Sequence, residues 1–207
     1  KTLDYVRNAL KGDGNMSIAL VTFGNRAYDN ALAELVGLME DCGMYPIGAA
    51  AMVTRHVFSD TLGALRPNND DIAALEDFAN RVAEKILSSS DDKISALKVP
   101  GESHPDKYYT PLKTTNAPAS FLKAMPSFDS ERCTRCGKCL ELCPMGSIEL
   151  DGGVPVFSGI CIKCQACRLS CPTEAIAFTD PDYHSHIAMI EQTFASPKQP
   201  EFFIAEE

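Results

Sequence analysis

The segments CTRCGKCLELCPMGSIEL (133–150) and CIKCQACRLSCPTEAIAF (161–178) are two copies of one cysteine pattern. Each copy reads C-x2-C-x2-C-x3-C-P, and together they hold all but one of the nine cysteines in the chain. Each copy then runs through a helical turn into a strand-like end, at 148–150 and at 176–178. A repeated array of soft ligands at fixed spacing predicts a small metal-binding domain.

This spacing suits a [4Fe–4S] cluster, which needs four thiolates at the corners of a tetrahedron. The first three cysteines wrap around three irons, and the fourth, before proline, turns away to the other cluster. The sequence therefore predicts two [4Fe–4S] clusters with crossed ligands, which are Cys133, Cys136, Cys139 and Cys171 for one and Cys161, Cys164, Cys167 and Cys143 for the other. Because cysteine fills every ligand position, we expect electron relay and no catalytic residue.

Zinc and disulfides are the alternatives. Zinc sites usually use two C-x2-C pairs, and a third cysteine followed by Cys-Pro is not a zinc signature. Disulfides would require an oxidising compartment, and no leader sequence opens the chain. Two complete copies of the pattern favour the clusters.

Residues between the cysteines are expected to shape and tune the loops. Pro144 and Pro172 end each loop, so that the fourth thiolate points across. Small residues, Gly137 and Ala166, would let backbone N–H groups approach the sulfurs. We expect the basic side chains to be solvated surface charges, with modest stabilisation of the reduced clusters as the alternative; they are Arg132, Arg135, Lys138, Lys163 and Arg168.

The N-terminal part has the pattern of an α/β domain. Buried strands are predicted at 16–24 and 45–53, and amphipathic helices at 32–39 and 69–87, the latter capped by Asn69 or Asp70. Strand, helix, strand and helix in this order predict a parallel crossover. Two parallel strands cannot bury themselves, so we expect further strands from upstream or from a partner, with self-association as one outcome.

Four segments follow from these patterns. Residues 1–90 form the α/β part, and 91–126 form an ordered, Pro-rich connector that begins after Ser88-Ser89-Ser90. Residues 127–180 form the two-cluster domain, and 181–207 form an acidic C-terminal tail whose last residues are solvated. The net charge of −9 argues against nucleic-acid binding. No run of eighteen apolar residues suggests a membrane span. Oxygen-labile clusters and the missing leader lead us to expect the cytoplasm of an anaerobe.

The segment Phe23-Gly24-Asn25-Arg26-Ala27-Tyr28-Asp29-Asn30-Ala31-Leu32 resembles the loop after the fourth strand of flavodoxin-like proteins. Residues 55–59 and 66–70 fit the same group, as does the acidic-aromatic ending Glu201-Phe202-Phe203. With the cysteine repeat, the chain resembles anaerobe iron–sulfur flavoproteins, which join a flavodoxin-like domain to a bacterial-type two-[4Fe–4S] ferredoxin. The implied fold is α/β plus α+β: a partial flavodoxin-like parallel sheet, lacking its N-terminal half, followed by a pseudo-twofold ferredoxin module.

The resemblance implies FMN at the carboxyl ends of the strands. Tyr28 would then stack on the flavin, and Gly24, Asn25 and Arg26 would offer donors; alternatively, Tyr28 packs on its own domain. The family's phosphate loop has no counterpart here, so we expect this chain alone to bind FMN poorly. Electrons would pass between the clusters, FMN and redox partners, which are a ferredoxin, a flavoprotein or an oxidoreductase. The alternatives are a ferredoxin-type carrier without flavin and a flavin-dependent reductase of an organic substrate.

Overall fold

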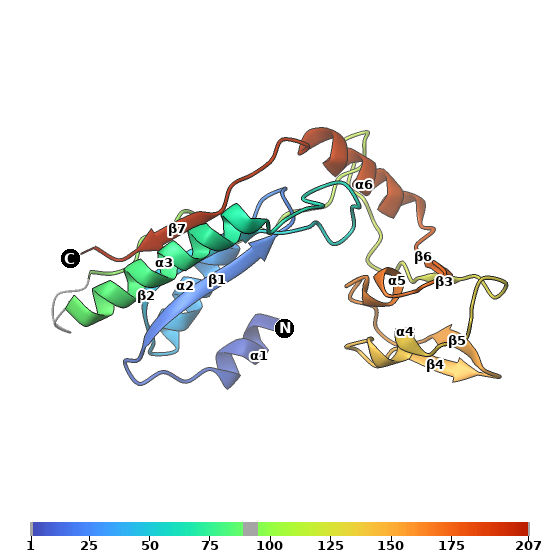
Figure 1. Ribbon diagram of the computed structural model, residues 1–207, viewed down its shortest axis with the longest axis horizontal. Coiled ribbons are helices and arrows are strands. Elements are labelled where there is room, and N and C mark those ends of the chain that lie inside the picture. Colours follow the sequence, from blue (N-terminus) through green and yellow to red (C-terminus); the bar gives the residue numbers. More distant parts are fainter. Residues whose placement is uncertain (1, 89–94, 207) are drawn as a thin grey trace. The chain divides into compact units, whose positions relative to one another are not determined.

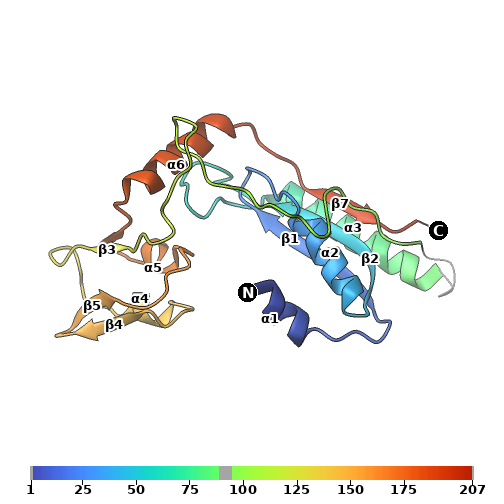
Figure 2. The ribbon, with the colours of Figure 1, turned by 180° about the vertical axis from the view of Figure 1, so that it is seen from behind.

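A computed structural model describes residues 2–88 and 95–206 of the chain, which is shown from opposite sides in Figures 1 and 2. The chain divides into two compact units: one contains residues up to Tyr109 and from Phe194 onwards, and the other contains Thr110–Thr193. Each is described by itself below. No helix in the described residues has the length and apolar character needed to cross a membrane.

The first unit is built on a three-stranded sheet with β2 (Tyr45–Val53) at its centre. β1 (Met16–Phe23) pairs with β2 in parallel, from Met16 opposite Tyr45 to Phe23 opposite Val53. The predicted parallel crossover is confirmed, with α2 (Ala31–Asp41) between the two strands. Eight of the nine β2 residues are buried, because α2 covers one face of the sheet and α3 (Asn69–Ser88) covers the other (Figures 1 and 2). A short helix, α1 (Thr2–Ala9), precedes β1.

The third strand of this sheet comes from the opposite end of the chain. β7 (Glu201–Ile204) runs antiparallel to β2, with Glu201 opposite Ala51 and Ile204 opposite Gly48. Phe202 stacks on Phe78 of α3 at a centroid distance of 5.2 Å. Glu201 is exposed, as predicted for the acidic residues of 201–207, but 201–204 are not a free end, since backbone pairing and an aromatic contact hold this acidic-aromatic segment in the sheet.

α6 (Pro181–Thr193) is a further element that the sequence analysis assigned to the acidic tail. One side of this helix is buried in the second unit and consists of Tyr183, His186, Met189 and Ile190. His186 Nδ1 forms a hydrogen bond with the Leu112 carbonyl, 2.9 Å away. The helix is thus part of the core of its unit, although its sequence is polar overall.

β1 is an edge strand within the described residues, where β2 is its only partner. Met16, Ile18 and Leu20 lie on one face of β1 and are 36%, 46% and 45% exposed. An apolar face beside an open edge is the feature from which the sequence analysis expected additional strands. That expectation stays a prediction.

The second unit contains two small sheets. β4 (Ile148–Asp151) and β5 (Val154–Phe157) form a hairpin with its turn at 151–153, and both glycines of the turn have positive φ. β3 (Ser127–Phe128) pairs antiparallel with β6 (Ile176–Ala177). The strand-like ends of the two cysteine repeats therefore lie in different sheets.

The described part of the connector has contacts in both units. In the first unit, Leu97 is buried and the Glu102 N–H donates to Asn30 Oδ1 at 3.1 Å. In the second unit, Phe121 is buried against Tyr183, and Lys113 Nζ pairs with Asp182 at 3.0 Å. Residues 89–94, which include two of the serines predicted to open the connector, lie outside the described residues.

The first turn of α3 is held by a capping box one residue earlier than predicted. Asn68 Oδ1 accepts from the Asp71 N–H at 3.0 Å, and Asp71 Oδ2 accepts from the Asn68 N–H at 2.8 Å. Asp71 also forms a paired contact with the Arg66 guanidinium. Burial alone would raise the pKa of Asp71, but the bonds from Arg66 and Asn68 and the Arg66 charge bring it below its usual value.

We predict that Asp71→Ala lowers the free energy of unfolding by about 3–5 kcal/mol, because it leaves a largely buried guanidinium unpaired. Asp77→Ala is the matched control on the same helix, since the Asp77–Arg81 pair is 3.8 Å apart and exposed; it should cost about 0–1 kcal/mol. Denaturant unfolding measures both. The Asp71 contribution should be present above about pH 4 and vanish as the pH falls through its lowered pKa. Equal losses for the two variants would contradict the buried-pair interpretation.

Candidate metal centre

The two cysteine loops have matching backbones. Each has a non-glycine residue with positive φ at the position before its second cysteine, with 58° at both Arg135 and Lys163. The next pair of left-handed residues is Gly137 (76°) and Gln165 (63°), which precede the short helices α4 (Lys138–Glu141) and α5 (Ala166–Leu169). These turns bring successive thiols to the same side of each loop.

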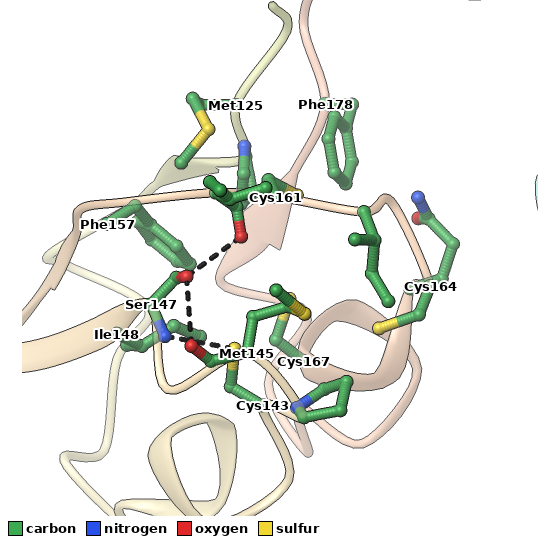
Figure 3. A pocket seen from close by; sticks show the side chains of 15 residues that line it. Met125, Cys143, Met145, Ser147, Ile148, Phe157, Cys161, Cys164, Cys167 and Phe178 are labelled. Carbon is green, nitrogen blue, oxygen red and sulfur yellow. Dashed lines mark hydrogen bonds between the residues drawn. The ribbon is translucent and has the colours of Figure 1, made fainter. Parts of the chain in front are cut away.

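The eight cysteines of the repeat surround two separate hollows of the second unit. One hollow is lined by Cys161, Cys164, Cys167 and Cys143, whose side chains are drawn in Figure 3. The other is lined by Cys133, Cys136, Cys139 and Cys171. Each hollow thus takes three thiols from one repeat and the fourth from the other, which is the grouping that the spacing predicts.

Nothing in the described residues resembles a site for one ion, since no three His, Cys, Asp or Glu side chains converge on a point. All nine cysteines are free thiols. A cubane differs from a single ion because its four ligands stand apart around a body of iron and sulfide. The donor set and its arrangement around each hollow fit such a group.

In each repeat, a backbone N–H group at an equivalent position donates a hydrogen bond to the fourth cysteine. The Ser147 N–H donates to Cys143 Sγ at 3.4 Å, and the Ala175 N–H donates to Cys171 Sγ at 3.2 Å. The Ser147 hydroxyl also donates to the Ile160 carbonyl at 2.8 Å, which joins the two repeats (Figure 3). The sequence analysis did not identify these donors, whose signal was their common place four residues after a Cys-Pro cysteine.

The surroundings shift the pKa values of the thiols in different directions. Burial raises the pKa of Cys167 to about 11, and the Cys161 and Cys164 groups contribute in the same direction. Burial likewise raises the pKa of Cys139. For Cys171, burial acts upward, but N–H donors from the 173–176 turn lower the pKa below its ordinary value. Neighbouring thiolates that repel each other in a half-buried hollow require a cationic centre to hold them deprotonated.

The basic residues of the repeat differ in their exposure to solvent. Arg132, Arg135 and Lys138 are exposed as predicted, and Arg132 pairs with Glu174 at 3.3 Å. The prediction of a solvated charge is wrong for Lys163, which is 7% exposed and donates from Nζ to the Leu122 carbonyl at 2.6 Å.

Gln165 is another residue that the sequence analysis missed. The repeat aligns it with Gly137, where the analysis had paired Gly137 with Ala166. Gln165 is 1% exposed, and its Oε1 accepts from the half-buried Arg168 at 2.9 Å. A buried, hydrogen-bonded side chain here supports a left-handed conformation that glycine adopts without strain in the other loop.

The residues that the resemblance assigns to flavin lie together after β1. Asn25 is 3% exposed, and its amide donates to the Phe194 and Ser196 carbonyls at 2.7 and 3.1 Å, while Oδ1 accepts from the Lys198 N–H at 2.8 Å. Its side chain therefore fastens the segment that leads to β7. A Cβ on Gly24 would lie 2.5 Å from His56 Cα, so this glycine permits a close backbone approach.

Arg26 and Tyr28 line a hollow of the first unit, together with Phe23, Ala27, Asp29, Pro100, Gly101, Lys198 and Glu201. The Arg26 guanidinium pairs with Asp29 and lies 3.7 Å from the centroid of the Tyr109 ring. Tyr28 packs edge-on against Phe23, and its hydroxyl donates to Glu201 at 3.0 Å. Burial and the Glu201 carboxylate raise the pKa of Tyr28 to about 12.

Comparison with known proteins gives two family matches within the second unit. Residues 126–149 and 158–174 each match a family described as a 4Fe-4S binding domain. The chain is 36% identical over 53 residues to pyruvate synthase subunit PorD of Methanocaldococcus jannaschii, a match that covers 25% of this chain and 62% of that protein. The chain thus carries a two-part 4Fe–4S ferredoxin module.

Two further relatives match over segments of similar length. A subunit of the Na(+)-translocating ferredoxin:NAD(+) oxidoreductase complex of Acetobacterium woodii is 41% identical over 55 residues, covering 24% of this chain and 16% of that protein. An uncharacterized ferredoxin of M. jannaschii is 34% identical over 59 residues, covering 27% and 40%. The chain covers less than two thirds of each relative.

Pairs of substitutions test the crossed grouping. If the grouping is crossed, Cys133→Ala with Cys171→Ala removes ligands of one cluster, and the iron content should fall from about eight to about four atoms per chain. Cys133→Ala with Cys143→Ala, which lie in one repeat, should remove both clusters and nearly all iron. Iron analysis after anaerobic preparation measures this, with Cys42→Ala as the control that keeps all iron. If the iron content were instead lower in the Cys133→Ala, Cys171→Ala variant than in the Cys133→Ala, Cys143→Ala variant, each repeat would hold its own cluster.

Proposed function

We propose that the chain transfers electrons through two [4Fe–4S] clusters, one in each hollow of the second unit. The observation that carries this proposal is the crossed lining of the hollows, four cysteines each, in a segment that matches 4Fe–4S binding domains. Such clusters accept and release single electrons with little rearrangement of their ligands.

The protein's own residues define how this centre works. The loops place three thiols around each hollow, and the fourth cysteine of each repeat spans to the other hollow, so the two clusters lie near each other. The Cys136 and Cys164 thiols are exposed, whereas Cys139 is buried. Each hollow therefore has one ligand at the surface, which is where an external carrier would approach. No side chain is assigned to substrate chemistry.

The relatives suggest the kind of partner. One is a subunit of pyruvate synthase, and another is a subunit of a ferredoxin:NAD(+) oxidoreductase complex. By analogy, this chain would exchange electrons with a ferredoxin, a flavoprotein or an oxidoreductase. We propose this role in place of catalysis on an organic substrate.

Iron and sulfide analysis tests the central proposal. Anaerobically prepared protein should contain about eight iron and about eight acid-labile sulfide atoms per chain. Reduction with dithionite should bleach its visible absorbance and produce electron paramagnetic resonance signals of reduced clusters. Stoichiometric zinc without iron would refute the electron-transfer function.

We propose as a second function that the first unit couples the clusters to FMN, as the resemblance to flavodoxin-like proteins implies. The hollow after β1 supports this, because its aromatic residues Phe23 and Tyr28 suit a planar ligand; its cations Arg26 and Lys198 are balanced by Asp29 and Glu201. The Asn25 side chain is engaged elsewhere, so Gly24 and Asn25 would contribute backbone groups. Without a phosphate loop, the affinity should be weak.

Tyr28→Ala should weaken FMN binding about tenfold, because it removes the stacking surface. Tyr108→Ala is the matched control, since Tyr108 also donates its hydroxyl to a glutamate, Glu34, at 2.6 Å but does not line this hollow. Quenching of flavin fluorescence measures the affinities. A wild-type chain that leaves flavin fluorescence unchanged at saturating FMN would contradict FMN binding at this hollow.

A further inference from the structure

Lys163 is a buried cation in the loop that carries Cys161, Cys164 and Cys167, and its side chain does not itself line their hollow. Its side chain is 7% exposed, and its ammonium donates to two carbonyls, that of Leu122 at 2.6 Å and that of Cys161 at 3.4 Å. No carboxylate of the described residues pairs with it. A buried ammonium without a counter-ion is unfavourable, and proteins rarely retain one.

The loop that holds Lys163 also carries three of the four thiols that line this hollow. Lys163 stands between two of the cysteines that line the hollow and is bonded to the backbone of one of them. Four thiolates around a cluster carry a net negative charge, which increases by one on reduction. A cation held out of water at this edge interacts with that charge more strongly than an exposed cation would.

The first repeat provides an internal comparison. Arg135 occupies the equivalent position with the same φ of 58°, yet its side chain is exposed. Arg135 lines the other hollow, but solvent and salt screen its exposed guanidinium, so its charge acts on that hollow more weakly than a buried charge would. The two repeats thus share their cysteines and their backbone but differ in whether this cation is buried.

We propose that Lys163 is a positioning residue that sets the reduction potential of the cluster held by Cys143, Cys161, Cys164 and Cys167. This inference rests on the proposed electron-transfer function. Its ammonium acts as counter-ion to the cluster and, through the Cys161 carbonyl, fixes the loop. During reduction each cluster takes one electron from a low-potential donor, and no bond is formed or broken. The reduced state gains more from the cation, so Lys163 raises the potential of this cluster relative to the same site without it.

A redox titration of the complete protein, poised with dithionite and followed by electron paramagnetic resonance, tests the assignment. Lys163→Met should shift the reduction equilibrium of one cluster about tenfold towards the oxidised form, which is about 59 mV for one electron. The midpoint potential of the other cluster, held by Cys133, Cys136, Cys139 and Cys171, should change much less. Arg135→Met is the matched control and should change the other cluster less than about threefold. The Lys163→Met shift should persist at about 1 M salt, where exposed charges are screened.

Lys163→Arg keeps the positive charge and so distinguishes an effect of this charge on the reduction potential from a merely structural role of the side chain. It should retain both clusters and a midpoint close to that of the wild type, even if Lys163→Met loses iron. Equal shifts for Lys163→Met and Arg135→Met, or two unchanged midpoints with full iron content, would overturn the inference. So would a Lys163→Arg protein with full iron and the midpoint of Lys163→Met. A wild-type protein without iron would instead refute the proposed function.

Discussion

Repulsion between thiolates is the constraint on which the second unit depends. One hydrophobic cluster of this unit contains Cys139, Ile148 and Ile176, with Cys143, Cys167 and Cys171 packed against them. In this cluster, cysteines occupy positions that leucines and valines would fill in an ordinary core. Four thiolates around one half-buried hollow would repel each other; burial, followed by the charges of Cys161 and Cys164, raises the pKa of Cys167. Metal centres would relieve that repulsion and bind the two repeats together, which would couple cluster binding to the folding of this unit. Each repeat depends on the other, because the fourth thiol of each hollow comes from the other repeat.

Local chemistry explains which features could be predicted from the sequence. The grouping of the cysteines around the hollows follows from spacing and the Cys-Pro turn, and β1, α2, β2 and α3 follow from hydrophobic periodicity. β7 was missed because its partner β2 lies about 150 residues away, and four residues such as EFFI have no periodicity that indicates an antiparallel partner. The cap of α3 was misplaced by one residue because three adjacent polar residues, Asn68, Asn69 and Asp70, are all competent caps; the reciprocal bonds with Asp71 select Asn68. The burial of Lys163 depends on the Leu122 carbonyl, which no local pattern specifies.

The pseudo-twofold symmetry of the cysteine repeat does not extend to its surroundings. Ile160 and Ile162, which are 68% and 55% exposed, occupy the positions that Arg132 and Thr134 hold in the first repeat. Met145, 43% exposed, corresponds to Thr173. The hollow that contains Cys164 therefore has an apolar rim, and the one that contains Cys136 has a polar and basic rim. Two chemically different edges favour different contact surfaces, which is the property expected of a relay that receives electrons from one protein and delivers them to another.

The loop after β1 in the first unit has the opposite character, because the polar side chains of Asn25, Arg26 and Tyr28 are already bonded within that unit. Asn25 fastens the 194–198 segment with three hydrogen bonds, Tyr28 is bonded to Glu201, and Arg26 is paired with Asp29. These bonds all bring the loop after β1 together with β7 or the segment that leads to it, or stiffen the loop itself. A ligand in the neighbouring hollow would thus meet a loop that is fixed in advance, and its binding would not have to order that loop. The same bonds limit what the loop can offer, since a side chain engaged in the fold is not free to follow a ligand. Recognition there must rely on the half-buried ring of Tyr28 and on backbone groups, which favours a flat aromatic ligand over one that needs many directed polar contacts.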